Sequence, residues 1–444
     1  MQVDDGHDID PSQPMSLSDA MLLGTRLHRL NLLDEAYGLY TAVLEAEPEH
    51  SDALQFLGIL EHQRHNDALA LDYMQRAVSQ VPDAPGVHHN LGNILLELRR
   101  FDEAAGAYQR CTQLGGETAE LLNNIGILRR QQGRFAEAEA AYRRALALDP
   151  ESVDAYNGYG RVLERQKRPE EALKQYQKAL QLAPKDRGAR YHTGMALCVL
   201  ERFDEAAKVF RDWLAVDPDN PSAKHYLAAC TGKDVPQRAS DAYVASTFDD
   251  FAQSFDAKLE SLHYRAPELV ADAVRKLLGE PAATLDILDA GCGTGLCGPK
   301  LRPYALHLLG VDLSAKMLEK AKRRADYHEL HKAELTAFIE ARPQSFDLIV
   351  SADTLCYFGD LTAVCAAAER ALRPGGRLIF TVEALGEGDY KLHSLGRYSH
   401  AQPYLRRVLE TSGFELTLLE EAVLRSEFGS PVHGYVIAAR SNRS

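Results

Sequence analysis

The sequence contains no run of the roughly 18 apolar residues that a membrane-spanning helix requires, so no membrane span is predicted. Its first residues, MQVDDGHDIDP, lack a hydrophobic segment and do not resemble a signal peptide. The seven cysteines are odd in number and none forms a Cys-x-x-Cys pair, which argues against a disulfide framework and a zinc site. We therefore predict a cytoplasmic protein with reduced thiols and no bound metal.

An excess of basic charge is also absent. Lys and Arg number 50 while Asp and Glu number 64, so the net charge is −14. Nucleic acids and anionic lipid surfaces bind to basic faces. The charge balance predicts that neither is a partner, although it is compatible with a local basic groove. No oligomeric state is predicted.

A repeat with a period of 34 residues fills the first half of the chain, as the first step, 58 − 24 = 34, shows. Glycines recur at this spacing, at Gly24, Gly58, Gly92, Gly126, Gly160 and Gly194. An alanine follows each glycine by 12 residues, at Ala36, Ala70, Ala104, Ala138, Ala172 and Ala206. Prolines end most of the units, at Pro48, Pro82, Pro150, Pro184 and Pro218. Each unit is predicted to be two helices that cross closely at the small residues and end at the proline.

These repeats resemble the tetratricopeptide repeat family over about residues 17–220, in six units. One unit cannot bury its own apolar face, so neighbouring units are expected to stack into a solenoid. Residues 1–16 are predicted to form a disordered acidic tail, and residues 221–236 a capping helix and a linker.

The resemblance implies that the first helix of each unit lines a concave groove. This groove is expected to carry the amides of Asn90, Asn93, Asn124 and Asn157. An amide both donates and accepts hydrogen bonds, so such a row can hold the backbone of an extended peptide. A protein or peptide partner is predicted on this interpretation. The alternative is that these are ordinary polar residues on a solvated face.

After Pro236, short apolar segments alternate with helical stretches. The predicted strands are residues 285–290, 306–311, 346–351, 377–382, 414–419 and 435–439. This alternation indicates a mostly parallel, doubly wound sheet, which binds ligands at the carboxyl ends of its strands. The predicted fold class is therefore two-part: an all-α tetratricopeptide-repeat solenoid followed by an α/β Rossmann-like domain over residues 237–444.

A glycine-rich loop follows the first of these strands and matches two patterns. Residues Gly293–Gly298 match G-x-G-x-x-G, the pattern of dinucleotide-binding loops. Residues Asp289–Gly295 also match D-x-G-x-G-x-G, which resembles motif I of the class I S-adenosylmethionine (SAM) methyltransferases. The last two predicted strands resemble the final hairpin of that family. Together these features favour a methyltransferase over a nicotinamide enzyme.

The resemblance implies SAM as the cofactor and a set of residues that hold it. Asp312, at the end of the second strand, is expected to accept hydrogen bonds from the ribose hydroxyls. Glu334 is expected near the adenine amino group, where the family more often has aspartate. The full set is Asp289, Gly291, Cys292, Gly293, Gly295, Asp312, Leu313, Met317, Glu334 and Leu335.

Methyl transfer from a sulfonium depends mainly on positioning, and a base is needed only where the acceptor carries a proton. The candidate catalytic residues are polar groups near the expected mouth of the site: Asp353, Tyr357, His393 and His400. The candidate substrate-binding residues are Tyr264, Arg265, Arg397 and Tyr398. The segment 393–400 can also be interpreted as a helix surface. The aromatic segment before Tyr264 can be either a lid over the cofactor or a docking face.

Three functions are compatible with these patterns. The first is methyl transfer to a protein or peptide that the repeats recruit. The second is methyl transfer to a small molecule, with the repeats used for assembly. The third is a scaffold that binds SAM without catalysis, which the intact glycine loop and Asp312 disfavour. No Asp/Asn-Pro-Pro-Tyr motif follows the fourth strand, which disfavours the methylation of adenine, cytosine or glutamine amino groups.

Overall fold

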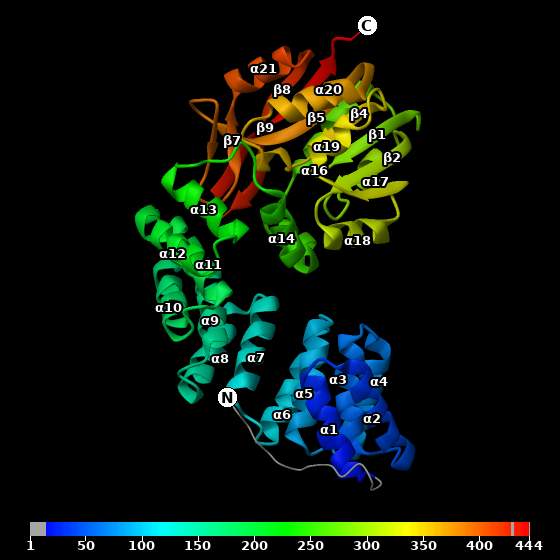
Figure 1. Cartoon of the computed structure of the whole chain (residues 1–444), viewed down its shortest axis with the longest axis vertical. Coiled ribbons are helices and arrows are strands. Elements are labelled where there is room, and N and C mark those ends of the chain that lie inside the picture. Colours follow the sequence, from blue (N-terminus) through cyan, green and yellow to red (C-terminus); the bar gives the residue numbers. More distant parts are fainter. Residues whose placement is uncertain (1–14, 428–429, 444) are drawn as a thin grey trace. The chain divides into compact units, whose positions relative to one another are not determined.

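Figure 1 shows a computed structural model of the chain, which describes residues 15–427 and 430–443. The chain forms two compact units, one up to His192 and one from Thr193 onward. Most of the predicted acidic tail, residues 1–14, lies outside the described residues. Within the described ranges, no helix is both long enough and apolar enough to cross a membrane.

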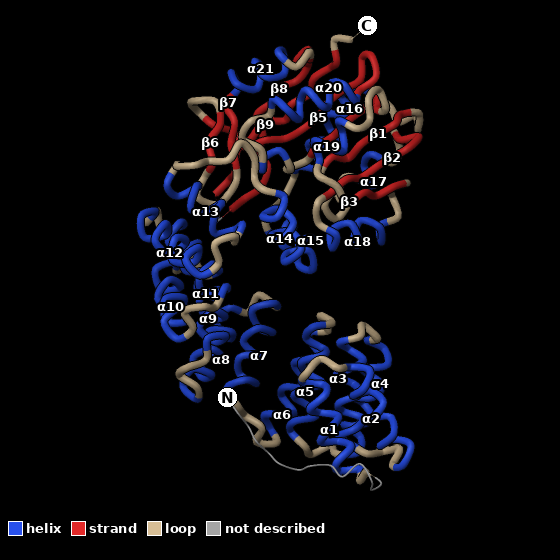
Figure 2. The backbone as a smooth tube through the Cα atoms, in the orientation of Figure 1, coloured by secondary structure: helices blue, strands red, loops and turns tan. Residues whose placement is uncertain are grey.

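All regular secondary structure that the structure describes in the first unit is helical (Figure 2). Consecutive helices pair into repeats, as the 34-residue period predicts. The helices are α1 (Leu17–Arg29), α2 (Leu33–Ala46), α3 (Ser51–Gln63), α4 (Asp67–Gln80), α5 (Pro85–Glu97), α6 (Phe101–Gln113), α7 (Ala119–Gln131), α8 (Phe135–Leu148), α9 (Val153–Arg165), α10 (Pro169–Leu182) and the start of α11 (Arg187–Val199).

The small residues of the repeat lie where the two helices of a unit cross. A Cβ atom on Gly126 of α7 would stand 2.7 Å from the ring of Tyr142 on α8. A Cβ atom on Gly160 of α9 would stand 2.4 Å from the ring of Tyr176 on α10. Both rings are fully buried, so a larger residue at either glycine would displace a packed aromatic side chain. The predicted close crossing is confirmed.

The second unit begins with the last repeat helices and continues into an α/β domain. Its helices after α11 are α12 (Phe203–Val216), α13 (Pro221–Thr231), α14 (Asp241–Phe251), α15 (Phe255–Ser261), α16 (Ala266–Leu278), α17 (Gly298–Leu301), α18 (Ala315–Arg324), α19 (Leu335–Glu340), α20 (Thr362–Ala371) and α21 (Gln402–Thr411). Its strands are β1 (Leu285–Ala290), β2 (Ala305–Asp312), β3 (Glu329–Lys332), β4 (Phe346–Ser351), β5 (Leu372–Leu385), β6 (Tyr390–Leu392), β7 (Tyr398–Ala401), β8 (Phe414–Glu427) and β9 (Ser430–Ser441).

The sheet has the order that a doubly wound domain requires. Strands β3, β2, β1, β4 and β5 pair in this order and are parallel. β9 pairs with β5 in the antiparallel sense and forms a hairpin with β8. β7 pairs with the carboxyl end of β5, and β6 pairs with β7. The predicted α/β class and the closing hairpin are confirmed.

Two parts of the sheet differ from the strands predicted from the sequence. β3 has only four residues and none of them is fully buried, so it leaves no apolar run in the sequence. The segment 393–400 is not a helix surface but the turn and strand between β6 and β7. Its turn closes because His393 N donates to Arg397 O at 2.8 Å and Gly396 takes a φ of +85°.

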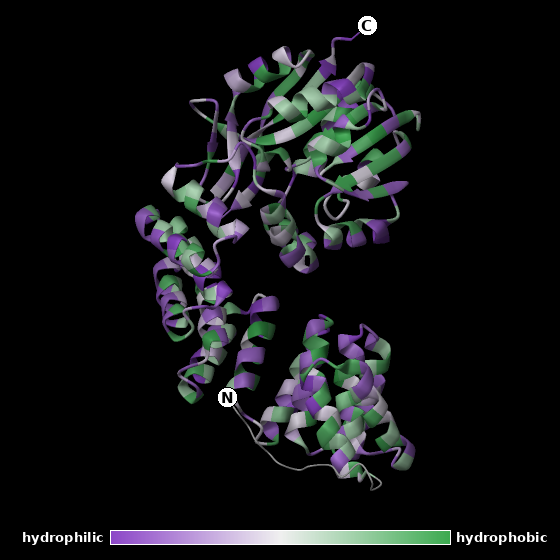
Figure 3. Cartoon of the chain, in the orientation of Figure 1, coloured by the Kyte–Doolittle hydropathy of each residue, from purple (hydrophilic) through white to green (hydrophobic). Residues whose placement is uncertain are grey.

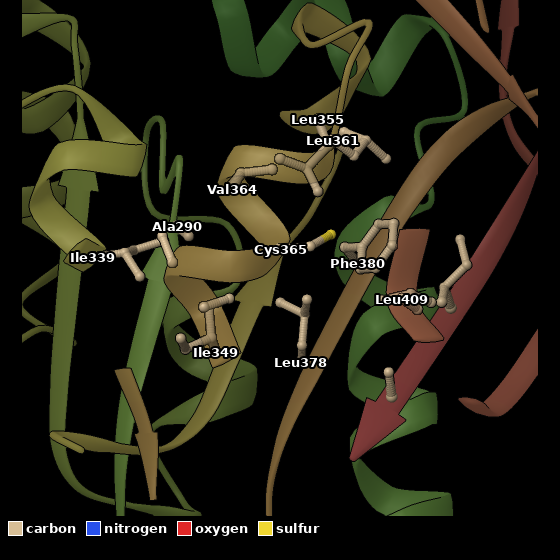
Figure 4. Close-up of a cluster of buried hydrophobic side chains, with 14 of the residues drawn as sticks. Ala290, Ile339, Ile349, Leu355, Leu361, Val364, Cys365, Leu378, Phe380 and Leu409 are labelled. Atoms are coloured by element: carbon tan, nitrogen blue, oxygen red, sulfur yellow. The ribbon is translucent and has the colours of Figure 1, made fainter. Parts of the chain in front are cut away.

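The central strands are mostly hydrophobic (Figure 3) and pack against helices on both faces of the sheet. Helices α19, α20 and α21 cover one face, and α16 and α17 cover the other. Figure 4 shows Val364 and Cys365 of α20 beside Leu378 and Phe380 of β5. This core fixes the carboxyl ends of the strands, from which the loops of the site project.

Candidate active site

A pocket lies at the carboxyl ends of β1, β2 and β4, where the loops that follow these strands meet. The glycine loop, the end of β2, the segment 333–335 and the segment 352–358 form one part of its wall. Side chains of α14 and α15 form another part, and Arg397 and Arg425 complete it. This is the place where a parallel sheet offers both backbone groups and side chains to a ligand.

The glycine loop approaches the pocket with backbone alone. Gly291, Gly293 and Gly295 have φ values of +83°, +53° and +85°, a region that side chains other than glycine disfavour. A Cβ atom on Gly291 would stand 2.2 Å from the hydroxyl of Thr354. Burial raises the pKa of Cys292 and Cys297 well above the usual thiol value, so both are protonated and are poor nucleophiles.

Two carboxylates stand at one end of the pocket, as the sequence predicts. Asp312 accepts the backbone N–H of Gly293 at 2.9 Å and that of Ser314 at 2.8 Å. Glu334 accepts two backbone N–H groups at the start of α19, at 3.0 and 2.8 Å. Each carboxylate oxygen can accept a further hydrogen bond, so hydroxyl and amino donors of a nucleoside suit this end. The bare glycine backbone and these acceptors fit SAM.

Three residues predicted to hold the cofactor lie behind this wall and do not line the pocket. Asp289 is 1% exposed and accepts the hydroxyl of Tyr327 at 2.6 Å. Burial raises the pKa of Asp289 to about 7, and its Oδ1 has no protein partner among the described residues. Met317 is fully buried, and Gly295 packs against Tyr327. The remaining members of the predicted set line the pocket: Gly291, Cys292, Gly293, Asp312, Leu313, Glu334 and Leu335.

The opposite end carries Asp353, Tyr357, Tyr264 and Arg397. Burial raises the pKa of Tyr357 and Tyr264 well above the usual phenol value, so both hydroxyls are protonated and can donate. Burial also raises the pKa of Asp353, while the guanidinium groups of Arg425 and Arg397 lower it. Asp353 has a φ of +54°, which turns its side chain away from the course of β4.

A buried ionic network supports this end. The side chain of Arg425 is 1% exposed and donates from Nη1 to both oxygens of Asp353, at 3.1 and 3.2 Å. It also binds Glu383, and its Nε lies 2.8 Å from Glu427. Arg397 binds the same two glutamates. Two guanidinium groups thus face three carboxylates.

Sequence reasoning missed Arg425, because the strand predicted at 414–419 ends before it. β8 continues to Glu427, and Arg425 follows the buried Leu424. A charged residue at an inward position of a longer apolar strand is the signal that pointed to it.

Four candidate site residues are not brought to the pocket wall. His400 is fully buried and donates or accepts through Nε2 at Gly359 O, 3.0 Å away, and burial lowers its pKa to about 4. His393 bonds to Ser399 at 2.6 Å. Tyr398 donates to the carbonyl of Pro236 at 2.6 Å, and Arg265 N donates to Leu424 O at 2.9 Å. These four residues hold loops around the site in place.

The helix that ends the repeats, α13, packs against the acceptor end of the site within the second unit. His225 is 4% exposed, and its Nε2 donates to the carbonyl of Gly396 at 2.9 Å. Its ring stacks on Tyr243 with the ring centroids 4.1 Å apart. Gly396 immediately precedes Arg397, so α13 directly supports a residue of the pocket.

The linker after α13 supports the same end. Ala239 N donates to the carbonyl of Tyr357 at 2.8 Å. The carbonyl of Gln237 accepts the N–H groups of Gly359 and Asp360, at 2.8 and 2.9 Å. The linker therefore runs as an added strand along the loop that carries Tyr357.

The aromatic segment before Tyr264 lies along the pocket. Phe248 of α14 and Phe255 of α15 line it, and their rings meet edge to face at 5.9 Å. Asp249 accepts the hydroxyl of Ser314, and Asp256 accepts that of Thr294. Both hydroxyls belong to the cofactor end, so this placement favours the lid over the docking face.

In the first unit, the predicted groove amides bond partly to one another. Asn124 donates to Asn93 at 3.0 Å, and Tyr108 donates to Asn93 at 2.9 Å. Asn90 is half-buried, and Asn157 has a buried oxygen without a partner in the described protein. The amides are therefore not plain solvated residues, and only part of the row is already satisfied.

Comparisons with known proteins agree with both halves. The Tetratricopeptide repeat family matches residues 21–85, 83–151, 123–187 and 163–230. The Methyltransferase domain family matches residues 288–380.

Similar curated proteins are methyltransferases. Methyltransferase-like protein 27 of Homo sapiens is 34% identical over 138 residues, which are 30% of this chain and 55% of that protein. The ubiquinone biosynthesis O-methyltransferase of Ralstonia nicotianae is 29% identical over 171 residues, 35% of this chain and 71% of that protein. The malonyl-[acyl-carrier protein] O-methyltransferase of Hamiltonella defensa is 32% identical over 149 residues, 32% of this chain and 53% of that protein. The chain spans little more than half the length of the first and third relatives.

The fold, the glycine loop with its carboxylates, and these matches agree. The chain carries tetratricopeptide repeats followed by a class I methyltransferase domain that uses S-adenosylmethionine.

Proposed function

We propose that the second half of the chain transfers a methyl group from SAM to an acceptor, and that the repeats recruit the protein or peptide that carries this acceptor. The observation that carries the proposal is the packing of α13 and its linker. These segments bond to the loops of Tyr357 and Arg397, so the end of the repeat region reaches the acceptor end of the pocket. A module used only for assembly has no need of these contacts.

The bound cofactor supplies a methyl group on a positively charged sulfur. In our proposal, Asp312 and Glu334 orient its nucleoside, and the glycine loop lies against it through backbone groups. Tyr357 and Tyr264 position the acceptor by donating hydrogen bonds. Asp353 is the base for an acceptor that carries a proton, because its carboxylate lines the pocket and Arg425 holds it in one orientation.

The proposed functional boundaries are residues 1–16, 17–220, 221–236 and 237–444. A fragment that begins at residue 237 lacks α13 and thus the partner of Gly396. A fragment that begins at Thr193 keeps the whole compact unit. The second fragment is the suitable one for testing the catalytic half alone.

We expect the full-length protein to transfer labelled methyl from SAM to a component of a cell extract. The measurement is incorporation of label after separation of the extract by size. Label in the protein fraction supports recruitment of a protein acceptor. Absence of label in every fraction, with SAM binding intact by calorimetry, would leave only the non-catalytic scaffold.

Label confined to small molecules would instead support the second candidate, a small-molecule acceptor. The names of two relatives favour it, since one is an O-methyltransferase of ubiquinone biosynthesis and the other acts on malonyl-[acyl-carrier protein]. By analogy, an oxygen of a hydroxyl or carboxyl group is then the acceptor atom.

Replacing His225 with alanine is expected to raise the Michaelis constant for the acceptor several-fold and to leave SAM affinity unchanged. The reason is that the variant leaves the buried carbonyl of Gly396 without its donor, beside Arg397 but far along the chain from the glycine loop. The measurement is steady-state kinetics with the identified acceptor, beside SAM calorimetry. His225→Gln, which can still donate, should recover most of the loss, and His433→Ala, at an exposed position on β9, should have no effect. An equal loss of SAM affinity would show a general folding defect instead.

A further inference from the structure

The groove of the first unit contains a cluster of polar atoms that the protein leaves without partners. Of the buried side-chain oxygens and nitrogens in the described residues, those lacking a hydrogen bond include Asn123 Oδ1, Arg130 Nε, Tyr142 OH, Asn157 Oδ1 and Tyr176 OH. All five belong to consecutive helices, α7 to α10. Burial of such groups without partners is costly, so a concentration in one place indicates a missing ligand.

The geometry places these groups around one point between α7 and α9. The ring of Tyr142 lies between Gly126 of α7 and Gly158 of α9, because a Cβ atom on either glycine would stand within 2.7 Å of it. A Cβ atom on Gly158 would also stand 2.7 Å from the Tyr142 hydroxyl. Asn123 precedes Gly126 by one helical turn, and Asn157 is its repeat equivalent, since 157 − 123 = 34. Both amides thus flank the same hydroxyl.

Two arginines share this place and have no carboxylate partner. Arg130 follows Gly126 by one turn on α7, and Arg161 follows Gly158 by one turn on α9. Neither forms an ion pair with any residue that the structure describes, whereas their neighbours Arg129, Arg143 and Arg168 each bind a glutamate. Arg161 is exposed at the groove surface.

The two guanidinium groups repel each other. Burial in the groove and the charge of Arg130 lower the pKa of Arg161, and Glu164 on the same helix acts in the opposite direction. Burial, followed by the positive charges of Arg161 and Arg130, also lowers the pKa of His192 to about 4, so this histidine is neutral. The groups that face the cluster therefore carry two positive charges and one negative charge.

We propose that this cluster, Asn123, Arg130, Tyr142, Asn157 and Arg161, binds the carboxylate of an aspartate or glutamate in an extended acidic segment of a partner protein. A guanidinium binds a carboxylate through two parallel hydrogen bonds, and the Tyr142 hydroxyl supplies a further donor. Each asparagine can turn its NH₂ group toward the ligand, because the O and N atoms of an amide exchange by a simple flip. The amides of Asn93 and Asn124, which already bond to each other, lie outside the cluster.

This inference deepens the proposed recruitment role by naming the chemistry of the partner. It also refines the predicted groove, since it moves the binding point from the satisfied amides of α5 to the open groups of α7 and α9. The net charge of −14 opposes the approach of an acidic peptide, so tight binding of such a peptide would reveal a local basic site.

The test is fluorescence anisotropy of a dye-labelled hexaglutamate peptide with the full-length protein, and a hexaglutamine peptide serves as the uncharged match. We expect binding of the first peptide only. Arg161→Gln and Arg130→Gln should each weaken it about tenfold, and the double variant about a hundredfold, because each removes a charged hydrogen-bond donor. Arg143→Gln, an arginine that is already paired with Glu139, should have little effect.

Three results would overturn the proposal: equal binding by the native protein and the double variant, equal weakening by Arg143→Gln, or binding only of a phosphorylated peptide. Circular dichroism of each variant checks that the repeats are folded. The assay measures peptide binding without methyl transfer, so its failure would leave the methyltransferase proposal in place. Failure of methyl transfer would likewise leave the peptide site intact.

Discussion

Replacing Asp312 with alanine is expected to weaken the binding of SAM about a hundredfold or more. The proposed role of this carboxylate is to accept hydrogen bonds from both ribose hydroxyls, and a hydrogen bond to a charged group contributes about 1.5–3 kcal/mol. Loss of two such bonds exceeds 1.4 kcal/mol, which corresponds to about tenfold in affinity, by a factor of two or more. The measurement is isothermal calorimetry with SAM.

The structure adds a second effect of this substitution. Asp312 also accepts the N–H groups of Gly293 and Ser314, so alanine leaves two loop amides without an acceptor. Asp312→Asn keeps one side-chain acceptor and is expected to lose about tenfold, close to one charged bond. Glu319→Ala, an exposed acid of the neighbouring helix α18, is the matched control and should bind normally. An unchanged dissociation constant for Asp312→Ala would refute the assignment of the ribose site.

Replacing Arg425 with methionine is expected to destabilise the second unit by about 3–5 kcal/mol, the usual cost of removing one partner of a buried ion pair. The substitution leaves Asp353, Glu383 and Glu427 close together with only Arg397 to balance them. The measurement is urea unfolding followed by fluorescence. Trp213, the one tryptophan of the sequence, is buried in α12 and therefore reports on this unit.

The pH dependence of this loss has a defined sign. Burial already raises the pKa of Asp353, and removal of Arg425 takes away the largest influence that lowers it. A carboxylate whose pKa is higher in the folded state destabilises that state above this pKa and ceases to do so once it is protonated. The difference between variant and native protein should therefore shrink as the pH falls from 7 toward 5.

Arg370→Met provides the control for this experiment. Arg370 pairs with Glu340 at the surface, where an ion pair contributes about 0–1 kcal/mol. It lies on α20 of the same unit, so it tests the general effect of losing an arginine. Equal destabilisation by both variants, or a loss at Arg425 that does not change with pH, would contradict a structural role for the buried network.

Much of the fold could be predicted from local patterns. The 34-residue period identified the repeats, because each glycine faces an aromatic ring and only a small residue fits there. The strands at 285–290 and 346–351 were predicted with their observed bounds, since a strand buried on both faces leaves a continuous apolar run. The short strands β3, β6 and β7 could not be predicted, because they are half-exposed or polar and owe their pairing to neighbours far along the chain.

The cofactor end and the acceptor end of the site differ in the same way. Asp312 and Glu334 follow strands at fixed spacings, so a local motif predicted them and they line the pocket. His393 and His400 were chosen for their chemistry in a polar segment, and the structure turns them toward loop carbonyls and hydroxyls instead. Arg425 lies 72 residues from Asp353 in the sequence, as 425 − 353 = 72, and no pattern of spacing joins them.

The sequence by itself determined the two-part architecture, the glycine loop and the cofactor class, because each depends on residues that are close together in the chain. Only the tertiary structure decided which polar groups share a buried environment. Packing of α13 against Gly396, of Arg425 against three carboxylates, and of Arg130 near Arg161 each joins elements whose separation no period encodes. Charge and burial act through distance in space, so the acceptor wall and the basic cluster became visible only when the chain was folded.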